Sequence, residues 1–183
     1  MARSRSLLGA LVLAGSMAFA GSLSAAPIIY SFSQGGYVEG ATITGTFTGD
    51  DLDKDGQLSS FDGEISAFSL SFSGNSIAAA FSHGLADLSG LVYDIGSGFI
   101  GDGLGGAVEG MASNWFGIAG FDYASGPGPV GGAGGRVLNI ATGGVTATRE
   151  MIRVTVVPEP GSLALFAAAL AALAVMRRRT VVR

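Results

Sequence analysis

The stretch Phe68-Ser69-Leu70-Ser71-Phe72-Ser73 places an apolar side chain at every second position, with serines between them. Because successive side chains of a β-strand point to opposite faces of a sheet, this alternation predicts a strand with one buried and one exposed face. The same period recurs at residues 42–47 and 152–156. Further strand candidates are residues 28–32, followed by turn residues 34–36, and more weakly residues 77–81, 91–95, 115–121 and 136–140.

Glycine, aspartate and serine separate these segments, and residues 27–157 contain no long apolar stripe of helical period. About eight short strands with such turns predict a mainly β fold, a small antiparallel β-sandwich or flattened barrel. We expect it to be flanked by an N-terminal signal helix and a C-terminal transmembrane helix. Residues 125–135, which hold six glycines and two prolines, are predicted to be a flexible loop within the domain.

The composition excludes several classes of protein. The 183 residues include no cysteine, which rules out disulfide scaffolds, thiol nucleophiles and cysteine metal sites. Residues 27–157, here called the body, carry thirteen carboxylates and four basic side chains, a formal net charge of −9. Such an acidic domain repels nucleic acid and suits cations.

Residues 1–26 have the features of a secretory signal peptide. Arg3 and Arg5 precede an uncharged apolar run at residues 7–19, and small residues follow up to Ala26. This order predicts export with cleavage near Ala25 or Ala26, with the step at residues 18–20 as a second option. A retained membrane anchor is the alternative interpretation.

Residues 158–183 have three parts in a fixed order. A proline-rich start is followed by sixteen small or apolar residues at 161–176 and then by Arg177-Arg178-Arg179. As a helix the apolar run spans about 24 Å, and arginines at its end extend its reach into the headgroups. Because arginines prefer the cytoplasmic side, the body is placed outside, in agreement with the signal peptide. A buried alanine-rich helix is the alternative interpretation.

This tail resembles the PEP-CTERM sorting signal of Gram-negative bacteria. The matching residues are Val157, Pro158, Glu159 and Pro160, the apolar run 163–175, and Arg177, Arg178 and Arg179. The resemblance covers about the last 26 residues. It implies recognition by an exosortase in the inner membrane, removal of the tail, and a mature body that is periplasmic, on the cell surface or extracellular.

Residues 51–62 fit a twelve-residue calcium loop. The ligand positions fall on Asp51, Asp53, Asp55, the backbone carbonyl of Gln57, Ser59 and Asp62. Gly56 stands where the chain turns sharply, and Leu58 is predicted to anchor the loop in the core. Asp62 replaces the usual bidentate glutamate, and Glu64 competes with it for that role. We expect a structural calcium ion, with a metal-free acidic turn as the alternative.

The remaining motifs do not indicate a catalytic or nucleotide-binding site. His83 is the only histidine, and Ser82 beside it points to the other face of a strand, so no catalytic triad is expected. Glu39, Glu64 and Glu109 offer carboxylates for a hydrolase, but their spacing selects no pair. Three glycine patterns of the GxGxxG type follow from composition and do not open helices.

We therefore expect an exported, non-catalytic surface or extracellular-matrix protein with a structural or interaction role. Exosortase, the inner membrane and exopolysaccharide are its expected partners. The alternative is a carbohydrate-binding or adhesive module of biofilm, which an exposed Trp115 and Tyr123 platform would favour, although core packing is the other interpretation of these aromatics. A hydrolase is the weaker alternative.

Overall fold

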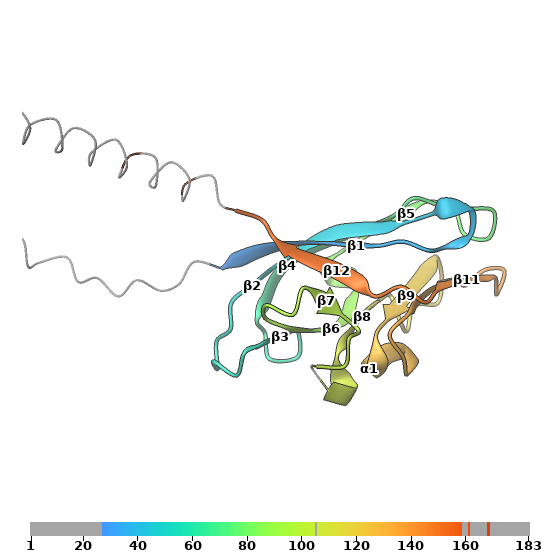
Figure 1. The fold of residues 1–183 in the computed structure, drawn as a ribbon. Helices are drawn as coiled ribbons and strands as arrows, with labels where there is room; N and C mark the ends of the chain where they lie inside the picture. Colours follow the sequence, from blue (N-terminus) through green and yellow to red (C-terminus); the bar gives the residue numbers. More distant parts are fainter. Residues whose placement is uncertain (1–26, 105, 159–160, 162–167, 169–183) are drawn as a thin grey trace, which may run out of the picture.

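The computed structural model describes residues 27–104, 106–158, 161 and 168, which form two antiparallel six-stranded sheets with little helix (Figure 1). In order across the first sheet, sheet A, lie β5 (Phe81–Gly84), β4 (Ile65–Phe72), β2 (Ile43–Gly49), β1 (Ile28–Gln34), β12 (Ile152–Val156) and β7 (Phe99–Ile100). In order across the second, sheet B, lie β11 (Val145–Thr148), β10 (Gly135–Asn139), β9 (Phe121–Ser125), β8 (Gly110–Ser113), β6 (Leu88–Asp94) and β3 (Gln57–Ser59). The predicted β-sandwich is confirmed.

The alternating sequence of β4 decides which face enters the core. Phe68, Leu70 and Phe72 are buried, whereas the serines between them are exposed. β2 pairs with β4 along its whole length, and Gly45 lies opposite Phe32 of β1 and Leu70 of β4 in the ladder. The rings of Phe32 and Phe68 stack 6.0 Å apart. A Cβ at Gly45 would overlap the Ser69 carbonyl oxygen and the Phe32 ring, so only glycine leaves room for both.

Aromatic side chains join the two sheets. Tyr30 stacks on Phe47 within sheet A at 4.9 Å, and both rings meet the edge or face of Tyr93 from β6 of sheet B. Phe81 of β5 stacks on Phe121 of β9 at 4.9 Å. These contacts form one continuous core between the sheets, which is the defining feature of a sandwich.

A buried polar group, Gln34, makes a second connection between the sheets. Its Oε1 accepts hydrogen bonds from the hydroxyls of Tyr37 (2.6 Å) and Tyr123 (2.8 Å). Its Nε2 donates to Ser125 Oγ and to the carbonyl of Glu150. Burial raises the pKa of both tyrosines, so they remain protonated donors. Because each buried donor and acceptor is satisfied, the network adds specificity to the core without an unpaired polar atom.

Several expected boundaries are wrong. Residues 77–80 are not in a strand, and β5 begins only at Phe81. Residues 115–120 form a turn between β8 and β9. The first hairpin turn is longer than residues 34–36 because it contains a short 3-10 helix, η1 (Val38–Gly40). The expected loop 125–135 holds one helical turn, α1 (Pro127–Val130), with a proline at its start.

Two further 3-10 turns, η2 (Leu85–Asp87) and η3 (Gly106–Val108), connect strands.

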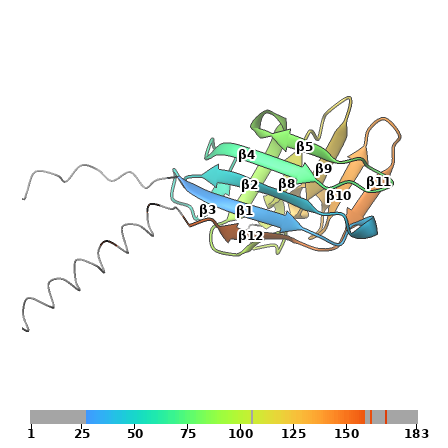
Figure 2. The ribbon, with the colours of Figure 1, turned by 90° about the horizontal axis from the view of Figure 1, so that it is seen from above.

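Both ends of the body lie side by side, because β1 and β12 are antiparallel neighbours (Figure 2). The β2–β3 loop, which holds the predicted calcium ligands, lies at this same end of the body (Figures 1 and 2). The fold therefore places the acidic loop at the same end of the body as the start of the predicted sorting signal.

Candidate functional site

The loop from Asp50 to Glu64 carries the chain from sheet A to sheet B and back. After β2 it turns, contributes β3 to the edge of sheet B, and returns to sheet A as β4. Leu58 is 1% exposed, which confirms that it anchors this excursion in the core. Lys54 and Gly56 both have positive φ (65° and 86°), the left-handed conformation that closes the loop tightly.

The carboxylate of Glu64 organises the loop. This side chain is 4% exposed, and its two oxygens accept the backbone N–H groups of Leu52 and Ser59, each at 2.8 Å. The two donors lie on either side of the calcium-loop turn. A buried carboxylate without such donors would be strongly unfavourable, so the fold depends on this arrangement.

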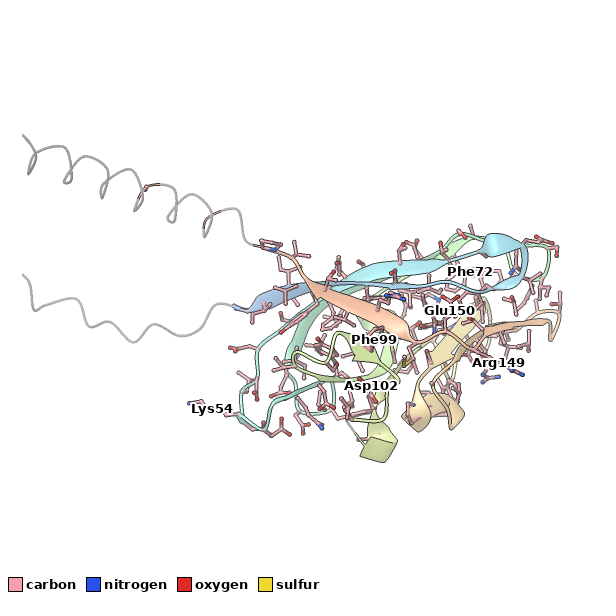
Figure 3. All side chains as sticks on the ribbon, in the orientation of Figure 1. Lys54, Phe72, Phe99, Asp102, Arg149 and Glu150 are labelled. Carbon is pink, nitrogen blue, oxygen red and sulfur yellow. The ribbon has the colours of Figure 1, made fainter. Side chains whose placement is uncertain are left out.

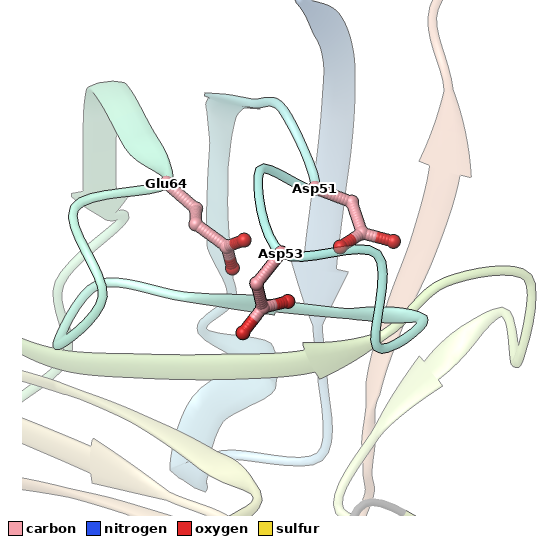
Figure 4. A group of neighbouring side chains, drawn as sticks. All are labelled: Asp51, Asp53 and Glu64. Carbon is pink, nitrogen blue, oxygen red and sulfur yellow. The ribbon is translucent and has the colours of Figure 1, made fainter.

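Asp51, Asp53 and Glu64 lie together, with one ligand oxygen from each within 4.8 Å of the others (Figure 4). In the described part of the chain, the one ion pair within 4.0 Å joins Arg136 to Asp122, so no basic side chain neutralises this cluster. Figure 3 shows Lys54, on the same loop, projecting away from the body. Three neighbouring carboxylates without a cationic partner form a site of the kind that a divalent cation can occupy.

Electrostatic repulsion within the cluster is visible at Asp53. The backbone N–H of Asp55 donates to its carboxylate at 3.1 Å and lowers its pKa. Desolvation and the charges of Asp55, Glu64 and Asp51 outweigh that bond, so the pKa of Asp53 is raised overall. A bound cation would reverse this repulsion.

The other predicted ligands lie outside this group of three. Asp55 accepts the N–H of Gln57 at 2.8 Å, and Ser59 Oγ accepts the N–H of Phe61. Gln57 pairs with Asp94 in the ladder between β3 and β6. Asp62 is exposed, and Glu64 takes the place beside Asp51 and Asp53 that the spacing gave to Asp62.

The other candidate glutamates also accept backbone N–H groups. Glu109 is fully buried and accepts the N–H groups of Gly101 (2.6 Å) and Gly103 (2.8 Å). No sequence pattern distinguishes this buried carboxylate from the exposed ones. Glu39 lies in η1 and accepts the N–H of Ser76. Each of these acids thus accepts at least one backbone N–H group.

An apolar groove of about 350 Å³ lies on sheet B. Its lining is uncharged: Phe61, Ser89, Gly90, Leu91, Val92, Val108, Gly110, Ala112, Trp115, Phe116, Gly128 and Pro129. A Cβ at Gly90 would lie 2.9 Å from the Phe61 ring, so glycine lets that ring lie against the sheet.

The aromatics 115–123 divide between surface and core. Phe116 is 88% exposed, whereas Tyr123 is fully buried, so the platform of Trp115 and Tyr123 does not form. The guanidinium of Arg136 lies 4.9 Å from the Trp115 ring and 3.8 Å from Asp122. Burial raises the pKa of Asp122, and Arg136 opposes this shift.

His83 joins the two sheets at the edge strand β5. Its Nδ1 lies 2.7 Å from Ser113 Oγ on β8, while Ser82 points the other way and contacts Ser71 at 2.8 Å. Ser82 and His83 therefore point to opposite faces of β5, as strand alternation predicts. Burial lowers the pKa of His83 from its ordinary value of 6.5, and Asp87 opposes this shift.

The last strand leads directly into the predicted sorting signal. β12 ends at Val156, and the N–H of Val157 donates to the carbonyl of Ile29 at 2.8 Å. Pro158, which follows at once, is exposed. A family model for the PEP-CTERM protein-sorting motif matches residues 156–179. The chain carries a PEP-CTERM sorting motif.

This motif indicates an exported protein that an exosortase sorts to the surface or the medium. No curated protein and no solved structure matches the chain. Several predicted features lie outside the described residues: the signal peptide at 1–26, Glu159, Pro160, the arginine triplet and the bulk of the expected transmembrane helix. Among the residues that are described, no helix has the length and apolarity to cross a membrane.

Protonation of His83, the only histidine in the sequence, predicts how the stability of the fold depends on pH. Because the folded state lowers the pKa of His83, the unfolded chain binds its proton more tightly. The contribution of His83 to stability is therefore complete above pH 6.5 and is lost as the pH falls below that value. In urea denaturation at about pH 7.5 and about pH 5.5, wild type should lose more stability than His83→Asn, which keeps a polar atom near Ser113. Equal losses in the two proteins would contradict the prediction.

Proposed function

We propose that this protein is a non-catalytic component of the cell surface or extracellular matrix, delivered by exosortase sorting. The observation that carries the proposal is the sorting motif at residues 156–179, which begins within the last strand of a complete β-sandwich. The precursor is held in the inner membrane by its C-terminal helix until the tail is removed. A non-catalytic role is supported by Glu39, Glu64 and Glu109, whose carboxylates bind backbone N–H groups.

Substituting Pro158, Glu159 and Pro160 together by alanine tests the sorting route. Since these residues form the segment that the enzyme recognises, the variant should accumulate as a full-length precursor in membranes. The measurement is the size and location of a tagged protein in cells with and without the exosortase. Because the substitutions lie beyond β12, the melting temperature of the body should stay unchanged. Normal processing of this variant would overturn the proposal.

We also propose that the 50–64 loop binds a structural calcium ion. Asp51, Asp53 and Glu64 supply three carboxylates, and calcium accepts about six to eight oxygens from side chains, carbonyls and water. Neutralising this repulsive cluster would stabilise the crossing between the two sheets. A structural role agrees with the plentiful calcium outside cells, where modules of this kind bind weakly.

Melting with calcium or with a chelator tests this site. Calcium at about a hundred times its dissociation constant should stabilise wild type by about 2.7 kcal/mol. Asp53→Asn should lose that gain, yet match or exceed wild type in chelator because one of three repelling charges is gone. The control Asp62→Asn, at an exposed acid outside the cluster, should keep the full gain. Identical melting of wild type in calcium and chelator would disprove calcium binding.

The groove on sheet B favours a second candidate function, an adhesive module for a neutral polysaccharide. The uncharged lining and the rings of Phe61, Trp115 and Phe116 suit the apolar faces of sugars better than a charged ligand. Binding of purified protein to polysaccharide from the producing cells is the measurement. Phe116→Ala should weaken it about tenfold, since an aromatic contact contributes roughly 1 kcal/mol or more. Ile118→Ala is the control, because Ile118 is 98% exposed and outside the groove lining. Equal binding by wild type and Phe116→Ala would exclude the groove.

A further inference from the structure

The outer edge of β11 presents backbone groups that have no partner in sheet B. Among the described residues, β10 is the one strand that pairs with β11. At the start of this ladder the N–H of Asn139 donates to the carbonyl of Gly144, which lies opposite it (2.8 Å). Because hydrogen-bonded and non-hydrogen-bonded pairs alternate along an antiparallel ladder, Thr146 directs its N–H and C=O toward β10, whereas Val145 and Ala147 direct theirs away. In the part of the chain that the structure describes, no hydrogen bond engages these outward groups.

The other three sheet edges are protected by the protein's own side chains. In each of them a carboxylate or hydroxyl binds the backbone of the edge strand: Glu64 binds Ser59 of β3, Asp87 binds Gly84 of β5, and Ser97 binds Phe99 of β7. β11 has the sequence Val-Thr-Ala-Thr, without the charge or proline that commonly prevents edge pairing. This strand is therefore the sheet edge best suited to pair with another chain.

The space beside β11 is open to such a chain. The loop after β4 contacts β11 over its inward face, where Asn75 Nδ2 donates to the buried Thr146 Oγ1 at 3.0 Å. The side chains of Val145 and Ala147 are exposed. A hollow of about 440 Å³, lined in part by residues 147–150, lies beside the strand. An incoming strand therefore has room along this edge.

A second copy of β11 is complementary to the first. When the two strands run antiparallel and Val145 lies opposite Ala147 of the second copy, a twofold axis passes beside Thr146. The outward groups then exchange four hydrogen bonds, two in each of the symmetric pairs. Residues 137–148 contain no charged side chain, so no like charges lie opposite each other in this pairing.

The distribution of charge also favours contact between two copies at this edge. β11 lies at the end of the body away from the acidic β2–β3 loop (Figures 1 and 2). Two of the four basic side chains of the body flank the strand, because Arg136 pairs with Ala147 in the ladder and Arg149 follows Thr148. Repulsion between two bodies of net charge −9 is therefore weakest here.

We propose that two copies of this chain join through β11, so that their two sheets B become one continuous sheet. The sorting motifs then lie at the far ends of the pair, because each motif begins in β12 at the opposite end of its own body. The pairing depends on neither the sorting route nor the calcium site, so its failure would leave both of those proposals standing.

Introduced cysteines test the register, because the chain has none of its own. Val145→Cys and Ala147→Cys are carried by two differently tagged full-length copies in the same cells. In the proposed register these positions face each other with Cα atoms about 5.5 Å apart, within the range of a disulfide. Two copies of the same variant place their cysteines on the diagonal, roughly 7–8 Å apart, which is too far.

The measurement is the yield of disulfide-linked dimer on non-reducing gels after treatment with a thiol oxidant. The mixture of the two variants should give several times more linked dimer than either variant alone. Comparable yields from the mixture and from a single variant would overturn the proposal. Linkage to a different protein, or no linkage, would show that a second copy does not occupy this edge and would overturn it equally.

Ala147→Pro tests the hydrogen bonds of the edge. Proline removes an outward N–H but no bond to β10, so the melting temperature should stay unchanged. Co-purification of two differently tagged full-length copies in detergent should fall tenfold or more, because two of the four hydrogen bonds are lost.

Val145→Lys is the second variant and keeps the test decisive if proline unfolds the strand. Its charge would lie beside Arg136 of the second copy, so co-purification should fall here as well. The matched control is Leu85→Lys, because Leu85 is 45% exposed and Val145 is 46% exposed. The control should co-purify as wild type does. Undiminished co-purification of Val145→Lys, or none between wild-type copies, would contradict pairing through β11.

Discussion

The buried carboxylate of Glu64 is the constraint on which the crossing between the sheets depends. It holds Leu52 and Ser59 by their N–H groups, and these residues lie on either side of the excursion that places β3 in sheet B. Without those two bonds a desolvated charge would remain in the fold. The same carboxylate completes the acidic cluster with Asp51 and Asp53, so the side chain that supports the loop is also part of the candidate cation site.

The strand pattern could be predicted where one face of a strand is buried and the other exposed. β4, β2, β1 and β12 alternate in this way, and their positions follow from the sequence within a few residues. The prediction of a strand at residues 115–121 was wrong for a physical reason. Phe116, one of the aromatic residues in this segment, is not buried in the core but lies on the surface, in the lining of the groove. Short edge strands such as β7 and β3 have too few residues to show a period.

The candidate site was predictable in part. The Asp51-x-Asp53 spacing located the acidic loop, because alternate residues of a tight turn direct their oxygens inward. Glu64, and not Asp62, lies beside Asp51 and Asp53 because of where β4 starts and because the Glu64 side chain is buried. Neither property can be read from the spacing of the acidic residues. The role of Glu109 depends likewise on the backbone donors of Gly101 and Gly103. The sorting motif needed no tertiary structure, because it is recognised as a linear segment.

The pairing of β1 with β12 joins residues about 125 positions apart, such as Ser31 and Thr155. Contacts of such long range form slowly, because the loop entropy must be overcome before the pairing contributes. Sheet A therefore stays incomplete during export until the segment next to the sorting motif has crossed the membrane. The part of sheet A that is completed last is therefore the strand that leads into the sorting motif.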